Sequence, residues 1–244
     1  MENSDIHINC DLGEGIQKES EIMPLIDACS IACGGHTGDY ESIRRTMLLA
    51  AKHRIKVGAH PSYPDRVNFG RKPMNISNSE LESAIKNQLE LFESARINTG
   101  IPVDHIKFHG ALYHDVAMNK STCRICWSVV KQFYPGVEMY VPPNSICQEV
   151  NDDMDRPFKI VHEAFGDRRY NENGHLVSRT DSEAIFRDPQ LVWDQILGVS
   201  QKQRIHTLNN TVIELKARTF CIHGDNPNAL NILKFIDEKR DSWN

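Results

Sequence analysis

Short runs of β-branched or aromatic residues recur along the chain, and each stops at a histidine, aspartate or glutamate beside glycine, proline or another polar residue. Buried strands of a parallel sheet favour apolar residues, so ionisable groups at their carboxyl ends predict one polar mouth above an apolar sheet. The runs are IHINCDLGEG at 6–15, SIACGGHTGD at 30–39, KVGAHPSYPDR at 56–66, HIKFHGALYH at 105–114, KIVHEAFGDRR at 159–169 and FCIHGD at 220–225.

Segments with helical periodicity separate these runs. Between 78 and 99 apolar residues recur every three or four positions, and Ser79 with Glu82 forms a candidate capping box at the start. Asp188 followed by Pro189 is typical of the N-cap and first turn of a helix. Further helices are expected at 40–53, at 121–134 and after His223-Gly-Asp, where Ala229, Ile232, Leu233 and Ile236 share one face.

The order of these segments predicts a parallel sheet. Strand candidates lie near residues 6, 30, 56, 105, 138, 159 and 219, and the crossover helices between most of them imply parallel pairing. A doubly wound open sheet is the main alternative, but no G-x-G-x-x-G follows the first strand. Charged candidates end nearly every strand, which favours a barrel. Chains of 244 residues commonly form one such barrel, so we expect 1–244 to be a single domain.

Composition narrows the class of protein. The formal net charge of -5 and the pI near 6.1 argue against nucleic acid or an anionic membrane as the main partner, since both favour a basic surface. No apolar run approaches the roughly 20 residues that span a bilayer. The polar start MENSDIHINC lacks the basic and apolar regions of a signal peptide, so we expect a cytoplasmic protein.

The cysteines are most simply small buried hydrophobic residues. There are seven, scattered along the chain. Cys123 and Cys126 form a C-x-x-C, but within a segment of helical pattern, without a second pair at zinc-ribbon spacing or a preceding strand. The sequence therefore favours packing over metal or redox chemistry for this pair.

Two carboxylates, Asp11 and Glu14, follow the first strand on one tight turn. Paired carboxylates can separate in pKa and serve as acid and base, or they can bind a cation. A solvated turn or helix cap is the simpler alternative. His36 and His60 end the next two strands, so Asp11, His36 and His60 are the ligands we expect if a divalent metal is present. No H-E-x-x-H spacing supports that metal site.

Lys107 and His109 alternate with apolar residues, which places both on one face of the fourth strand, pointing into a barrel. A buried lysine needs a partner. Lys107 is therefore either paired with a carboxylate such as Glu163 or held for an anionic substrate, and the sequence leaves both open.

Two long connections, 61–77 and 166–182, lack clear periodicity and are candidate functional lids. Guanidinium groups on these loops suit a carboxylate or phosphate ligand, although surface exposure is the default for arginine. They are Arg66, Arg71, Arg168, Arg169 and Arg179. Neither a G-x-S-x-G elbow nor a P-loop occurs, which argues against serine acyl transfer and against that mode of nucleotide binding.

Taken together, these segments resemble the LamB/YcsF family. A series of motifs in this order is specific, whereas any one alone is weak. The motifs are NCDLGEG at 9–15, SIACGGHTGD at 30–39, GAHPSYPDRVNFGR at 58–71, KFHGALY at 107–113, DRRY at 167–170, LVSR at 176–179 and CIHGD at 221–225. The chain departs from the family pattern at Phe108 and Ser178, where the family typically has proline, and at Arg169, where it has a small residue.

The resemblance implies a seven-stranded parallel β/α barrel similar to the polysaccharide deacetylase superfamily. It also implies a part in ATP-dependent 5-oxoprolinase, which opens 5-oxo-L-proline to L-glutamate with hydrolysis of ATP, held with Mg²⁺, and which needs two further subunits, B and C. Phosphorylation of the lactam carbonyl would make it susceptible to water. Two alternatives stay open: a stand-alone metal-dependent amide or deacetylase-type hydrolase, and a non-catalytic substrate-binding subunit.

Roles follow from this implied reaction. We expect Lys107 and Arg168 to neutralise phosphate or the substrate carboxylate, and Asp11, His109 and Glu163 to act as acid and base. The other residues expected to contact substrate are His36, His60, Asp65, Arg66, His223 and Asp225.

Overall fold

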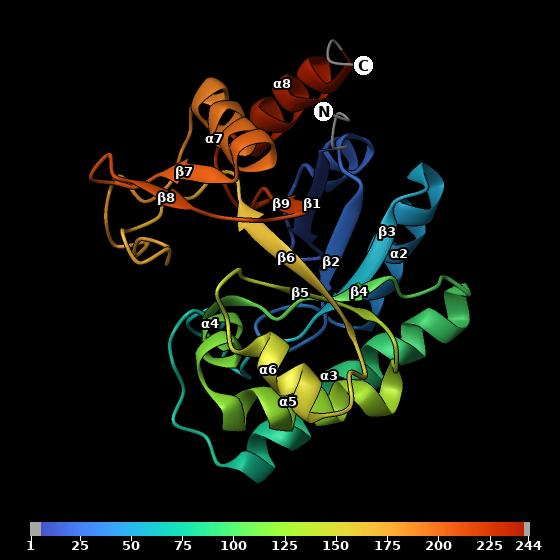
Figure 1. Cartoon of the computed structure of the whole chain (residues 1–244). Helices are drawn as coiled ribbons and strands as arrows, with labels where there is room; N and C mark the ends of the chain where they lie inside the picture. Colours follow the sequence, from blue (N-terminus) through green and yellow to red (C-terminus); the bar gives the residue numbers. More distant parts are fainter. Residues whose placement is uncertain (1–5, 242–244) are drawn as a thin grey trace.

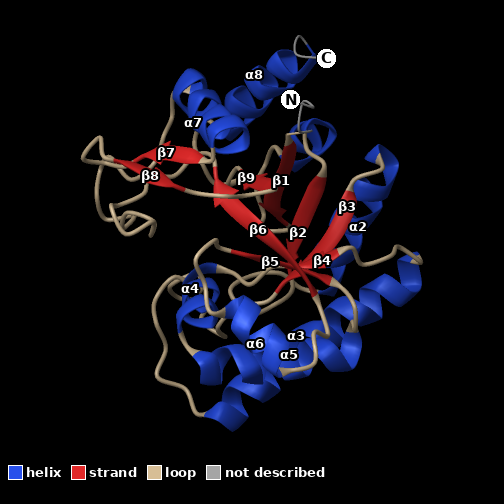
Figure 2. Cartoon of the chain, in the orientation of Figure 1, coloured by secondary structure: helices blue, strands red, loops and turns tan. Residues whose placement is uncertain are grey.

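Seven parallel strands close into a barrel in the computed structural model, which describes residues 6–241 (Figures 1 and 2). β1 pairs with β2 on one side and with β9 on the other, so the sheet has no free edge. The barrel prediction is confirmed over the doubly wound alternative, because an open sheet would leave two edges unpaired. In order around the barrel the strands are β1 (His7–Leu12), β2 (Ala28–Ala32), β3 (Lys56–His60), β4 (His105–Ile106), β5 (Glu138–Val141), β6 (Lys159–Phe165) and β9 (Thr219–Cys221).

Helices cover the outside of the barrel. α2 packs on α3, and α3 packs on α5, along one side of the molecule, while α7 packs on α8 near the top of the view in Figure 2. Their apolar stripes face the strands, which is the arrangement that buries a parallel sheet. The helices are α1 (Glu19–Ile22), the 3-10 helix η1 (Met23–Leu25), α2 (Tyr40–His53), α3 (Asn78–Thr99), α4 (Gly110–Met118), α5 (Lys120–Phe133), α6 (Cys147–Asp153), α7 (Pro189–Lys202) and α8 (Ala229–Asp241).

The predicted helices at 40–53, 78–99, 121–134 and after Asp188 are confirmed, but the cap of α3 was placed two residues late. Its capping box consists of Ser77 and Glu80, not Ser79 and Glu82. The Ser77 hydroxyl accepts from the Glu80 main-chain N–H, and Glu80 accepts from the Ser77 N–H. Both serines fit the capping pattern, and the residue that leaves helical geometry decides between them.

The fourth strand is much shorter than the run at 105–114 predicted. β4 stops at Ile106, and the apolar residues after Gly110 form α4. The main-chain N–H groups of Lys107 and His109 still donate to the carbonyls of Ala59 and Pro61, so the chain stays beside β3 up to the start of the helix. Short apolar runs do not distinguish a strand from a buried helix.

Part of the second long connection is ordered by its neighbours. Isolated bridges join Arg168 to Ile185 and Tyr170 to Leu176. A hairpin that the sequence did not predict, β7 (Arg204–His206) with β8 (Val212–Glu214), lies beside this loop, and Leu208 N–H donates to the Tyr170 carbonyl. Figure 1 shows the hairpin projecting away from the barrel.

All seven cysteines lie in the described part of the chain. All are buried, and none forms a disulfide there. Cys123 and Cys126 face the core from α5, next to the fully buried Trp127. The packing interpretation of the C-x-x-C is confirmed. Among the helices of residues 6–241, none has the length and apolar character needed to cross a membrane.

Helix α3 offers a matched test of this packing. Ile85 is fully buried, whereas Ile97 on the same helix is 64% exposed. Ile85→Ala should lower the free energy of unfolding by about 2–5 kcal/mol, because it removes buried methyl groups and leaves a cavity. Ile97→Ala should change it by less than about 0.5 kcal/mol. Urea unfolding followed by circular dichroism measures both, and equal losses would contradict the described packing of α3.

Candidate active site

The carboxyl ends of the barrel strands open into a cavity of about 460 Å³. This volume lies in the range of roughly 300–1,000 Å³ typical of small-molecule sites. Parallel barrels keep their chemistry at this end because the loops that follow the strands meet there. The ionisable residues that line the cavity are Asp11, His60, Arg71, Lys72, Lys107, His109, Tyr113, His114, Arg168, Arg179 and His223.

Lys107 lies at the centre of the site. Its ammonium nitrogen is 2.9 Å from Asp11 Oδ1 at the end of β1 and 2.9 Å from Glu163 Oε1 on β6. It also donates to Asn9 Oδ1 at 3.3 Å. Lys107 is 1% exposed and Glu163 is fully buried. The pairing that the sequence left open is therefore present, and the lysine also borders the cavity.

The charged groups of this cluster stabilise one another's ionised forms. Burial by itself lowers the pKa of Lys107, but the negative charge of Asp11 and further neighbours outweigh it and hold that pKa well above its usual range. Burial likewise opposes ionisation of Asp11, while His60 and Lys107 hold the pKa of its carboxyl well below its usual range. An ammonium and a carboxylate thus persist at the floor of the cavity at neutral pH.

Three histidines and Glu14 form a second cluster beside Asp11. The His36 and His109 rings stack 3.7 Å apart, and His36 Nε2 lies 3.0 Å from Glu14 Oε1. Burial lowers the pKa of His36 to about 2, so this imidazole is neutral. Burial and the nearby charge of Asp11 raise the pKa of Glu14 to about 7. Glu14 can therefore exchange a proton near neutral pH, which a solvated turn carboxylate could not do.

Asp167, after β6, and His223, after β9, form a dyad at the cavity. Asp167 Oδ1 accepts from His223 Nδ1 at 2.8 Å, and its other oxygen accepts from the Asn226 amide at 3.0 Å. In the neutral ring the hydrogen of His223 therefore lies on Nδ1, and Nε2 is an acceptor. An oriented imidazole of this kind suits a general base. Asp167 was not among the predicted site residues, although its place two residues after the end of β6 was a signal for it.

Arginines make up the outer wall. Arg71 and Arg179 both pair with Asp225, the latter at 3.3 Å, so one carboxylate connects the two long loops across the mouth. Arg168 is 5% exposed, and its hydrogen bonds go to the main-chain carbonyls of Val177 and Ala184. Burial, with Arg179 nearby, lowers the pKa of Arg168 to about 10, which still leaves it charged at neutral pH.

Some predicted residues lie elsewhere. Asp65 accepts from the main chain and side chain of Asn68 within its own loop, and Arg66 donates to the carbonyls of Gly34 and Gly38. Neither lines the cavity. Arg169 lies over the Phe186 ring instead, 4.6 Å from its centre.

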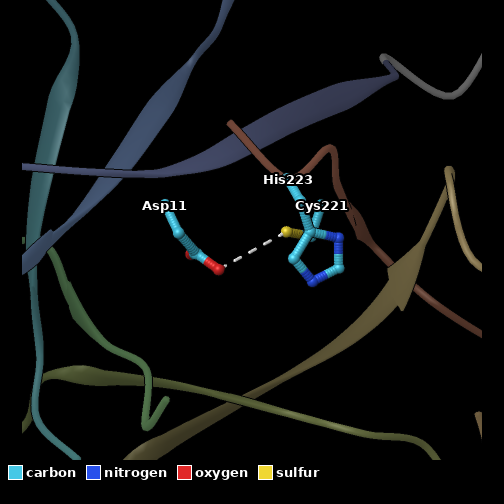
Figure 3. A group of neighbouring side chains, drawn as sticks. All are labelled: Asp11, Cys221 and His223. Atoms are coloured by element: carbon cyan, nitrogen blue, oxygen red, sulfur yellow. Dashed lines mark hydrogen bonds between the residues drawn. The ribbon is translucent and has the colours of Figure 1, made fainter. Parts of the chain in front are cut away.

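The residues expected for a metal do not form one set. His36 groups with Glu14 and His109, whereas His60 groups with Asp11 and His109. Asp11 also approaches Cys221 and His223, shown in Figure 3. Within each group the ligand atoms lie within 4.8 Å of one another. Barrel geometry therefore adds His109 to Asp11 and His60, and separates His36 from them.

The central ion pair can be tested by stability. Lys107→Met should lower the free energy of unfolding by about 3–5 kcal/mol, because two buried carboxylates lose their cation. Lys56→Met is the matched control, since Lys56 pairs with Asp104 at 3.2 Å with its side chain half exposed. That control should cost about 1 kcal/mol or less. Equal effects in urea unfolding would show that the Lys107 pairs do not hold the barrel together.

Comparison with known proteins agrees with this architecture. The LamB/YcsF family matches residues 6–242. A protein named as the 5-oxoprolinase A-subunit from Pyrococcus abyssi (strain GE5 / Orsay) is 33% identical over 236 residues, which span 95% of this chain and 92% of that protein. Another, named as the 5-oxoprolinase A-subunit 2 from Pseudomonas putida, is 34% identical over 242 residues, 96% of this chain and 93% of that protein.

A solved structure also matches nearly the whole chain. The crystal structure of a lactam utilization protein from Thermus thermophilus superimposes with a TM-score of 0.87 at 30% identity, covering 98% of this chain and 96% of that one. The family match and the relatives extend from the first barrel strand to the last helix. The chain therefore belongs to the LamB/YcsF family.

Proposed function

We propose that this chain is the first of the three components of an ATP-dependent 5-oxoprolinase and that its cavity binds 5-oxo-L-proline. Partner subunits B and C would complete the enzyme, which hydrolyses the lactam to L-glutamate with conversion of ATP to ADP and phosphate. The names of the relatives and of the solved structure support a substrate of this class. The observation that carries the proposal is a small cavity with a cationic wall above a floor of buried acid–base groups.

The cationic wall suits the substrate carboxylate. The guanidinium of Arg168 lines the cavity, and its hydrogen bonds to main-chain carbonyls leave its charge available to a ligand. A guanidinium recognises carboxylate or phosphate through paired hydrogen bonds. In the proposed complex Arg168 anchors the carboxylate and leaves the lactam ring over Lys107.

The floor suits the chemistry of a stable amide. Transfer of the terminal phosphoryl group of ATP to the lactam oxygen would activate the ring carbon, and a cation near that oxygen stabilises the charge that develops. Lys107 is the candidate cation. The acid–base candidates predicted from the sequence are Asp11, His109 and Glu163, and the oriented imidazole of His223 joins them. One of these groups must take the proton of the attacking water, and another must protonate the departing nitrogen. Departure of the nitrogen would leave the acyl phosphate of the glutamate side chain, and a second water would release phosphate from it.

A second candidate is a metal-dependent amide hydrolase that acts without partners or ATP. The group formed by Asp11, His60 and His109 favours it, because two imidazoles and a carboxylate can hold a catalytic metal with an open position. The two functions differ in their need for ATP.

Reconstitution separates these functions. Glutamate release from 5-oxo-L-proline should require this chain, subunits B and C from the same organism, ATP and Mg²⁺ together. Amino-acid analysis measures the product, and omission of each component is the control. Release by this chain alone without ATP would favour the second candidate, and no release by the complete mixture would eliminate the proposal.

Substitution at Arg168 tests the binding mode. In the complete mixture Arg168→Gln should raise KM for 5-oxo-L-proline about 10- to 100-fold, because a hydrogen bond to a charged group contributes about 1.5–3 kcal/mol. Arg169→Gln is the matched control and should leave KM unchanged, since Arg169 packs on Phe186. An unchanged KM in both folded variants would place the substrate carboxylate elsewhere.

A further inference from the structure

Hydrogen bonds to main-chain carbonyls indicate which ring nitrogens of His60 and His109 carry hydrogen. His60 Nδ1 lies 2.8 Å from the main-chain carbonyl oxygen of Lys107, and His109 Nε2 lies 3.0 Å from that of Phe69. A carbonyl oxygen only accepts hydrogen bonds, so each of these nitrogens carries a hydrogen. The other nitrogen of each ring, His60 Nε2 and His109 Nδ1, is then a lone pair in the neutral imidazole.

These two lone pairs point at one another across 2.9 Å. Two acceptors at this distance repel unless a positive species lies between or beside them. A metal ion satisfies both nitrogens at once, after the small outward shift needed to bring each to about 2.0–2.1 Å from zinc.

We propose that Asp11 Oδ2, His60 Nε2 and His109 Nδ1 bind one divalent transition-metal ion, with Zn²⁺ as the best match. Asp11 Oδ2 lies 3.4 Å from His60 Nε2, and the three ligand atoms lie within 4.8 Å of one another. Imidazole nitrogens select Zn²⁺, Fe²⁺ or Ni²⁺ over Mg²⁺, which prefers oxygen ligands. The site is therefore distinct from any Mg²⁺ that accompanies ATP.

The surroundings match those of a built metal site. Both imidazoles donate their remaining N–H to main-chain carbonyls, the outer contact that usually fixes a metal-binding histidine. All three ligands line the cavity, so a further coordination position faces bound substrate. Such an ion polarises an amide carbonyl oxygen.

Charge favours a divalent ion here. The carboxyl groups that face the two histidines from neighbouring elements are those of Asp11 and Glu14, with Glu163 reached through Lys107. One ammonium, that of Lys107, opposes these three acidic groups. Two added positive charges would balance the cluster when all three are ionised.

The neighbouring group of Asp11, Cys221 and His223 is a weaker site. Figure 3 shows Cys221 Sγ pointing at Asp11, and the two are 3.9 Å apart. Burial and the charge of Asp11 raise the pKa of the Cys221 thiol well above its usual range, whereas a metal binds the thiolate. This group therefore provides matched control positions within the same cavity.

Zinc binding by the whole chain, purified without a polyhistidine tag and dialysed against EDTA, tests the inference. Calorimetric titration with zinc chloride should give one ion per chain, and zinc, unlike magnesium, should raise the thermal midpoint. Asp11→Asn and His109→Gln should each weaken zinc binding about 100-fold or more, since even supporting contacts contribute about 10- to 100-fold. Cys221→Ser and His223→Gln should retain the affinity of the unmodified chain.

Absence of stoichiometric zinc binding by the unmodified chain would overturn the inference, whatever the variants do. So would loss of binding in Cys221→Ser or His223→Gln with binding retained in His109→Gln. His109 precedes α4 without a side-chain cap bond, so its replacement should leave that helix intact. No lactam, ATP or partner enters this experiment, so the zinc site and the ATP-dependent function can fail separately. Absence of zinc binding would also eliminate the second candidate function, which rests on the same group.

Discussion

The ammonium of Lys107 between the carboxylates of Asp11 and Glu163 is the interaction on which the site depends. It connects the strand ends of β1 and β6 with the segment after β4 through the inside of the barrel. Removing the Lys107 ammonium leaves the Glu163 carboxylate buried without a cation, which costs far more than an exposed pair could contribute.

The residues that line the cavity differ between its two sides. On the side of β3, His60 and His109 line the cavity, and behind them burial lowers the pKa of His36 to about 2 and raises that of Glu14 to about 7. On the side of β6 and β9, Arg168 stays charged and Asp167 orients His223. A polar ligand that bridges the two sides meets a cation, an oriented base and nitrogen ligands within one small cavity.

Several features were accessible to sequence reasoning because each depends on a local property. Periodicity located α3 and α7, and burial at every residue of β2 follows from its unbroken apolar and small side chains. The local pattern predicted the wrong N-cap of α3, because both Ser77 and Ser79 have a glutamate three residues later. It also failed after Ile106, where apolar residues that suit a strand instead form α4.

By itself the sequence determined the order of strands, the barrel class and which ionisable residues stand at strand ends, because hydrophobic period and strand-end position are properties of neighbouring residues. Only the tertiary structure decided which of those residues touch. Barrel closure brings Cys221 beside Asn9, and the pairing of the segment after β4 with the end of β3 brings His109 to His60. These contacts join positions about 50 to 210 residues apart. The pairs are His60 with His109, Asp11 with Lys107, and Asp11 with Cys221. Cross-strand distance, burial and hydrogen-bond direction set the pKa of Glu14 and the tautomers of the histidines, and none of them is encoded in the spacing along the chain.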